Sequence, residues 1–263
     1  MKRIFFVLVV LLFSTNLFAE EPIASGENQI TLQNNLNLVT QTKKLENEKS
    51  RYFIEAAYPQ LTGKGLDKSA QEFNQQISNF VFRRMEEFKA KVAAIEKSSL
   101  PDNAKNSALN IHFAATVLQP NNQPMISVRF NAESFFAGQA HPNHFIKTFN
   151  YDLNNGKMLA LKDLFKSGSG YLQLFANYSR TELENKKINP DHKWLSEGLV
   201  PTPENYRNWN LKSDGLLITF DEYQVAAYTH GQPEILIPYH ALQGMVSSRT
   251  PVALCVQDPA SCG

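Results

Sequence analysis

The sequence lacks an excess of charge of either sign. Lys and Arg number 26 and Asp and Glu number 25, so the formal net charge at pH 7 is +1. Proteins that bind nucleic acid by neutralising phosphates usually show a basic excess, so no nucleic-acid partner is expected. Charged residues make up 19% and apolar residues 43% of the 263 positions. That balance is typical of a globular chain, and the length is ample to bury a core.

Motifs for nucleotide binding and for a nucleophile elbow are also missing. The sequence has no P-loop and no G-x-G-x-x-G run, so no nucleotide cofactor is expected. The stretch Ser167–Gly170 resembles a nucleophile elbow, but serine stands at position 167 where that motif needs glycine. It is interpreted as a flexible loop. No catalytic residue and no cofactor are therefore predicted.

Two other groups of residues could carry chemistry but have unsuitable spacing. His141 and His144 form an H-x-x-H pattern that Pro142 interrupts, and no third ligand is suggested, so no metal site is predicted. Asp221 and Glu222 are adjacent, and adjacent residues on a strand point to opposite faces. They are therefore not expected to flank one glycosidic bond.

Only one run is apolar enough to suggest a membrane or export signal. Lys2 and Arg3 precede Ile4–Phe13, which carries no charge, and the small residue Ala19 follows. This order is typical of a cleaved signal, and the run is shorter than the roughly 20 residues that span a bilayer. We expect a signal peptide over residues 1–19 and a mature protein that is periplasmic or secreted, with no membrane span. An uncleaved membrane anchor is the alternative.

Cysteine is rare and confined to the end of the chain. Cys255 and Cys262 are the only two, and no histidine lies beside them. Export implies an oxidising compartment, so this pair is predicted to form a disulfide. Two free thiols and an intermolecular bond are the alternatives.

Alternation of apolar and polar residues predicts a chain rich in strands. The second strand is expected to stop at Pro59, and Lys212–Gly215 has the composition of a hairpin turn. Strands are predicted over residues 36–41, 52–58, 111–118, 125–136, 144–153, 209–211, 216–220 and 234–239.

Two longer segments have helical spacing. Apolar residues recur every three or four positions from Leu66 to Ile95, which predicts one long amphipathic helix capped by Asp67 or Ser69. Four of its residues are expected to be buried against a sheet: Phe73, Ile77, Phe80 and Phe88. The second helix is predicted from Tyr171 to Leu183. Shorter helices are predicted after Thr202, where Pro203 would take the first helical position, and around residues 240–245.

These elements predict an α+β fold with antiparallel sheets packed against two main helices, in two subdomains. After the signal peptide we expect a flexible leader over 20–35. An N-terminal α+β subdomain is expected over 36–135 and a C-terminal α+β subdomain over 136–247. Residues 248–263 are expected to form a tail that holds the cysteine pair.

Aromatic residues gather near the last strands. Tyr223, Tyr228 and His230 lie in a loop between two predicted strands, and Tyr239 ends the second. Tyrosine supplies a large contact area at low entropic cost and is common in recognition loops, although ordinary packing is the competing explanation. The candidate binding residues are Tyr223, Tyr228, His230 and His141.

Two sets of motifs resemble a known family. The first runs from Ala137–Asn143 to Leu161–Phe165, and the second from Leu216–Phe220 through Tyr223–Tyr228 to Ile237–Tyr239. Both resemble the extracytoplasmic domain family found in the lysozyme-sensing anti-sigma factor RsiV. Ala57–Leu61 and the long helix after it resemble the N-terminal companion domain also seen in the peptidoglycan deacetylase PdaC. The resemblance covers residues 36–247.

The resemblance implies a function that the residues alone do not. It implies a non-catalytic exported envelope protein that binds a lysozyme-like glycan hydrolase or cell-wall material such as peptidoglycan. The sensor's membrane anchor has no counterpart here, so an anti-sigma role is not expected. One alternative is an uncharacterised cell-wall glycan hydrolase that uses Asp221 and Glu222, or His141. The other is a structural envelope protein without a dedicated ligand.

Overall fold

The computed structural model describes residues 29–32, 35–95, 105–188 and 192–262. The predicted signal peptide lies outside these ranges, as does most of the predicted leader. Two residues of that leader, Ile30 and Thr31, form a short strand, β1, which pairs with β2. Among the helices described, none is long and apolar enough to cross a bilayer.

Seven strands form one long sheet in sequence order, β1 to β7. The others are β2 (Leu36–Asn47), β3 (Tyr52–Gly63), β4 (Ser107–Leu118), β5 (Met125–Phe135), β6 (Asn143–Asp152) and β7 (Lys157–Met158). All neighbouring pairs are antiparallel except β3 and β4, which are parallel. A parallel pair needs a crossover, and the long helix α1 (Lys68–Ala93) supplies it. The predicted α+β class is confirmed, with one parallel pair in an otherwise antiparallel sheet.

Strand β3 does not stop at Pro59, as the sequence predicted. It continues to Gly63, and Pro59 pairs with Thr40 of β2. The pairing of β3 with β4 ends at Ala56. Beyond that point β3 has a strand neighbour on one side only, and proline is tolerated in such edge positions.

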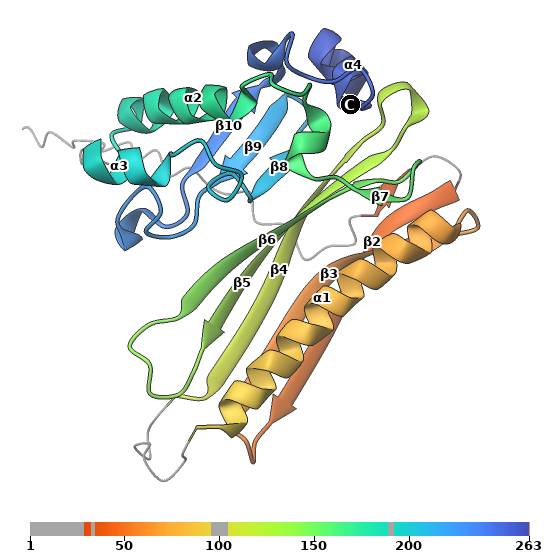
Figure 1. The fold of residues 1–263 in the computed structure, drawn as a ribbon. Coiled ribbons are helices and arrows are strands. Elements are labelled where there is room, and N and C mark those ends of the chain that lie inside the picture. Colours follow the sequence, from red (N-terminus) through yellow and green to blue (C-terminus); the bar gives the residue numbers. More distant parts are fainter. Residues whose placement is uncertain (1–28, 33–34, 96–104, 189–191, 263) are drawn as a thin grey trace, which may run out of the picture.

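Helix α1 covers one face of the long sheet (Figure 1). Its N-cap is Asp67, whose carboxylate accepts a hydrogen bond from the backbone N–H of Ala70 at 2.9 Å. Ser69, the other candidate cap, instead donates its hydroxyl to the carbonyl of Leu153 at 2.6 Å. The four residues expected to face the sheet are all buried, which confirms the predicted face of the helix.

A second, three-stranded sheet lies at one end of the first (Figure 1). Its antiparallel order is β10 (Glu234–Pro238), β9 (Gly215–Thr219), β8 (Trp209–Leu211). It packs with α2 (Tyr171–Asn185) and α3 (His192–Gly198) around a second hydrophobic core. The predicted hairpin between β8 and β9 is confirmed.

The helix predicted after Thr202 is wrong. Residues 203–206 form a turn, and the helix that precedes them, α3, which ends at Gly198, is not predicted from the sequence. The Thr202 hydroxyl accepts from the backbone N–H of Asn205 at 3.5 Å, as a helix cap would. Tyr206 is fully buried and donates its hydroxyl to the carbonyl of Leu199 at 3.0 Å. This hydrogen bond holds the chain after Thr202 close to the end of α3. The short helix expected around residues 240–245 is a 3₁₀ turn over Tyr239–Leu242.

The two hydrophobic cores do not follow the expected subdomain boundary. The expected boundary between residues 135 and 136 falls at the end of β5, which pairs with β6 from Met125–Asp152 to Ser134–Asn143. The first core includes residues up to Leu153, and the second draws mainly on residues from Leu161 onward. The extents of the subdomains stay a prediction.

A buried polar seam joins the two sheets. The hydroxyl of Ser127 on β5 donates to Asn150 Oδ1 on β6 at 2.6 Å and accepts from Asn210 Nδ2 and from the backbone N–H of Leu211, both at 2.9 Å. Asn150 Nδ2 donates to the carbonyl of Trp209 at 2.9 Å. β8 is an edge strand, so side chains of the first sheet satisfy backbone groups of the second.

The tail is folded rather than loose. Residues Val252–Gln257 form α4 and Pro259–Cys262 form a 3₁₀ turn. Cys255 and Cys262 are joined by a disulfide, and both belong to the second hydrophobic core.

Truncating Phe80 to alanine should destabilise the protein strongly. Its ring lies 5.1 Å from that of Phe130 and 5.3 Å from that of Phe149, and the residue is 4% exposed. The loss should be about 3–5 kcal/mol in the free energy of unfolding, measured by urea titration. Phe82 on the same helix is 41% exposed and is the matched control. Equal losses from Phe80→Ala and Phe82→Ala would contradict the assigned face.

Native exported protein should contain no alkylatable thiol. The disulfide closes a loop with a sequence separation of 7, for which chain entropy predicts a stabilisation of about 2 kcal/mol. Cys255→Ser with Cys262→Ser should therefore lower the free energy of unfolding by about that amount. Mass spectrometry after alkylation tests the bond, and two labelled cysteines in the native protein would rule it out.

Candidate functional site

Three of the four candidate binding residues meet in one place. Tyr223 and Tyr228 lie in the loop that joins β9 to β10, and His141 lies in the connection from β5 to β6. The ring centroids of Tyr223 and Tyr228 are 5.7 Å apart, with 29° between the ring planes. The ring of Tyr228 lies 5.3 Å from that of His141 and 6.4 Å from that of His144. We call these four rings the aromatic cluster.

The fourth candidate, His230, is not brought into the aromatic cluster. It is exposed at the end of the 3₁₀ turn Tyr228–His230. Within the described residues, no ring contact joins it to the other candidates. Tyr239, which the sequence placed in the same aromatic group, is buried in the second core and donates its hydroxyl to the carbonyl of Lys212 at 2.7 Å. Burial raises the pKa of Tyr239, so its phenol stays protonated.

His144 links the β5–β6 strand pair to the loop after β9, which carries Tyr223 and Tyr228. Its Nδ1 lies 2.8 Å from Glu222 Oε1 in the loop after β9, and its Nε2 lies 3.2 Å from Glu133 Oε2 on β5. An ionised carboxylate only accepts hydrogen bonds, and a neutral imidazole has one N–H to give. Only the doubly protonated ring can donate to both ionised carboxylates at once. Glu222 is the more enclosed partner, with 17% of its side chain exposed.

Glu133 and His144 are not among the binding residues predicted from the sequence. Glu133 and His144 are direct cross-strand partners in the β5–β6 ladder, which is the one signal that could have linked them. That signal requires the register of the hairpin to be known. The carboxylate of Glu222 comes from a distant segment, and no pattern in the sequence indicates that contact.

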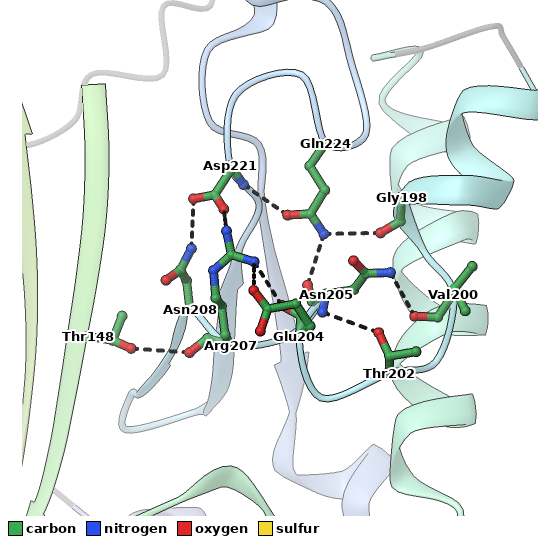
Figure 2. Close-up of polar contacts among 10 residues, drawn as sticks. All are labelled: Thr148, Gly198, Val200, Thr202, Glu204, Asn205, Arg207, Asn208, Asp221 and Gln224. Atoms are coloured by element: carbon green, nitrogen blue, oxygen red, sulfur yellow. Dashed lines mark hydrogen bonds and ion pairs between the residues drawn. The ribbon is translucent and has the colours of Figure 1, made fainter. Parts of the chain in front are cut away.

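The loop after β9 is held in place by a polar network (Figure 2). The Gln224 side chain donates to the carbonyls of Gly198 and Asn205 at 3.0 and 2.9 Å, and accepts from the backbone N–H of Asp221 at 3.1 Å. Asp221 in turn accepts from Asn208 Nδ2 at 2.9 Å and pairs with Arg207. The loop is therefore anchored to the segment after α3 on several sides.

Close packing against α3 adds to this support. A Cβ atom on Gly198 would lie 2.0 Å from the carbonyl oxygen of Gln224, so this position requires glycine. The indole N–H of Trp194 donates to the carbonyl of Tyr223 at 2.7 Å. Tyr223 has a φ of 64°, a left-handed conformation that is uncommon for a bulky residue. The residue is 55% exposed.

Asp221 and Glu222 bond to different partners, Arg207 and His144, so they do not face each other across a shared space. Across the described ranges, no group of three or more His, Cys, Asp or Glu side chains is arranged to hold a metal ion. What the site offers is an exposed tyrosine on a fixed backbone, stacked on further rings. Strained residues held by their surroundings are frequent at binding sites.

Comparison with known proteins finds a family profile that matches the C-terminal part of the chain. Residues 162–240 match the profile of a family described as "Protein of unknown function (DUF3298)". This span contains the loop with Tyr223 and Tyr228, whereas Glu133, His141 and His144 precede it.

One curated relative is the peptidoglycan-N-acetylmuramic acid deacetylase PdaC of Bacillus subtilis (strain 168). It is 26% identical over 180 residues, which are 68% of this chain and 37% of the deacetylase. The chain thus corresponds to little more than a third of that protein. The expected likeness to PdaC-type domains is supported, and the likeness to RsiV stays a prediction.

Two solved structures share the fold. A DUF3298 family protein from Pseudomonas aeruginosa PAO1 has 16% identity and a TM-score of 0.55, over 81% of this chain and 94% of its own. A second member, from Bacteroides fragilis NCTC 9343, has 18% identity and a TM-score of 0.57, over 88% and 98% of the two chains. At these identities the likeness establishes the fold alone.

Glu222→Gln should loosen the contact between the two histidines of the aromatic cluster and the loop that carries its two tyrosines. The substitution removes the negative charge of Glu222, which is one of the two partners of His144. The bond between them is partly buried and stabilises the contact by about 1 kcal/mol. We expect smaller ring-current shifts of the His141 and His144 ring protons in NMR spectra, because the ring of Tyr228 moves away from them. Glu197→Gln on α3, where the carboxylate is 70% exposed, is the control. Unchanged histidine shifts in Glu222→Gln would show that this bond does not position the loop.

Proposed function

We propose that this protein is an exported, non-catalytic binding module of the cell envelope. The aromatic cluster would bind a lysozyme-type glycan hydrolase or the cell-wall glycan that such enzymes cleave. The name of the PdaC relative assigns that protein to peptidoglycan, which supports a role at the cell wall. The apolar run before Ala19 supports export.

The observation that carries the proposal is a row of three rings, of which Tyr223 and His141 are exposed and Tyr228 is half-buried. The ring centroid of Tyr228 lies 5.7 Å from that of Tyr223 and 5.3 Å from that of His141. Rows of rings stack against the apolar faces of sugars, and exposed tyrosines are frequent anchors in protein interfaces. Because the backbone of Tyr223 is fixed by Trp194 and by the network around Gln224, little order has to be gained on binding.

A second candidate function is hydrolysis of cell-wall material. The observation that favours it is the 2.8 Å contact between His144 and Glu222, since a carboxylate often orients a histidine that acts as a general base. Against it, Glu133 and Glu222 both contact the same imidazole rather than facing each other across a space for substrate. Glycosidases need such a space between their two carboxyl groups.

Binding and turnover separate the two candidates. Mature protein is incubated with purified peptidoglycan and, separately, with lysozyme, and both bound protein and released sugar or acetate are measured. Saturable binding to either without product release supports the proposal. Product release that disappears in His144→Gln identifies a hydrolase instead. Absence of binding to both rules out the proposed function.

Tyr228→Ala should weaken this binding by about 2 kcal/mol, as the loss of a central interface tyrosine does. The melting temperature should change little, because Tyr228 is only half-buried and contacts other surface rings. Tyr178→Ala on α2 is the control, since that tyrosine is also half-buried but lies outside the aromatic cluster. Calorimetric titration and thermal melting on both variants check the outcome. A Tyr228→Ala protein that is destabilised yet binds normally would show that the ring serves packing.

A further inference from the structure

A separate hollow lies on the opposite face of the β5–β6 hairpin from the aromatic cluster. Side chains alternate between the two faces of a strand, so Ala132 and Phe145 face α1 while Glu133 and His144 face away from it. The hollow is open to solvent on one side and has a volume of about 190 Å³. It is lined by α1 residues Arg84, Glu87, Phe88 and Lys91, and by sheet residues Leu109, Ala132, Ser134, Phe136, Asn143 and Phe145.

The sequence of β5 explains why this space is unfilled. Ile126, Val128 and Phe130 point toward α1 and fill the first core with large side chains. The next two positions of the same row are Ala132 and Ser134, which are small. The layer between α1 and the sheet is therefore full along most of its length and hollow near the end of the helix.

The inner walls of the hollow are apolar. Phe88, Leu109 and Ala132 are buried, and the half-buried rings of Phe136 and Phe145 stand beside them. The rings of Phe88 and Phe136 lie 5.2 Å apart. An apolar cavity of about 150 Å³ is large enough to bind benzene. The hollow thus has room for a phenyl-sized body.

The rim of the hollow is positively charged. The guanidinium of Arg84 lies 4.3 Å from the ring centroid of Phe145, and Lys91 Nζ lies 5.8 Å from that of Phe136. The lining contains one carboxylate, Glu87, which accepts from Arg84 Nη1 at 2.9 Å. Within the part of the chain that the structure describes, no carboxylate is in ion-pair distance of Lys91. Among the residues that the structure describes, Lys91 is therefore an ammonium group at the rim with no partner of opposite charge.

We propose that this hollow binds a small carboxylate with a phenyl-sized or branched apolar body. The body occupies the space walled by Phe88, Ala132 and Phe145, and the carboxylate lies at the rim, where Lys91 is its ion-pair partner. The apolar walls favour burial of the body, and the ammonium group of Lys91 selects a negative charge. A neutral apolar molecule of the same size would gain only the first of these contributions.

The first test is a titration of the full mature protein with 3-phenylpropionate, followed by two-dimensional NMR. Saturable shifts are expected for amides of the lining residues on α1, β5 and β6. The uncharged analogue 3-phenylpropanol should bind about tenfold more weakly, which corresponds to about 1.4 kcal/mol. No saturable shifts with 3-phenylpropionate, or equal affinity for the two compounds, would overturn the proposal.

Two substitutions locate the site. Lys91→Gln should weaken 3-phenylpropionate binding about tenfold and leave 3-phenylpropanol unaffected, because it removes only the charge. Ala132→Leu should abolish binding of both compounds by filling the hollow. Lys68→Gln, at the other end of α1 with 90% of the lysine side chain exposed, is the control.

These variants also show how the proposal could fail. Lys91 is at the surface, so Lys91→Gln gives a result even if the larger leucine at position 132 disturbs folding. Unchanged binding of 3-phenylpropionate to Lys91→Gln, or to a folded Ala132→Leu protein, would place the ligand elsewhere and refute the assignment. Because the hollow and the aromatic cluster occupy opposite faces of the hairpin, either outcome leaves the proposed function untouched.

Discussion

The hydroxyl of Ser127 is the centre of the buried hydrogen bonds that join the two sheets. Ser127 bonds to Asn150 within its own sheet and to Asn210 and Leu211 of the other, all at 2.6 to 2.9 Å. An apolar contact alone would allow β8 to slide over β5 and β6, because the hydrophobic effect is not directional. Hydrogen bonds in a buried setting require their partners, and unmade ones are unfavourable. The seam therefore specifies a single register between the sheets.

The aromatic cluster forms only when the two sheets are in this register, because its rings come from both. The long sheet contributes Glu133, His141 and His144, and the loop after β9 contributes Glu222 and the two tyrosines. Neither part has a candidate site by itself. The hydrogen bonds of Gln224 determine the shape of the loop. The seam between the sheets determines where the loop lies relative to β6. A binding surface assembled in this way is preorganised.

The sequence predicts what local periodicity controls and misses what distant contacts control. The buried face of α1, including Phe80, follows from helical spacing, and it is confirmed. Pro59 was expected to end a strand because the edge position of β3 is not visible in the sequence. Thr202 has the local signal of a helix cap, but the buried Tyr206 overrides it. Aromatic clustering indicated the tyrosines, whereas the contact between His144 and Glu222 joins residues with a sequence separation of 78.

Amide hydrogen exchange in Ser127→Ala tests most directly whether the seam positions the site. The variant removes the shared hydroxyl while leaving every residue of the aromatic cluster in place. The account predicts faster exchange than in the wild type both in β8 and in the loop from Tyr223 to Gly231, with α1 and β3 unchanged. Faster exchange confined to β8, with the loop as protected as in the wild type, would contradict it.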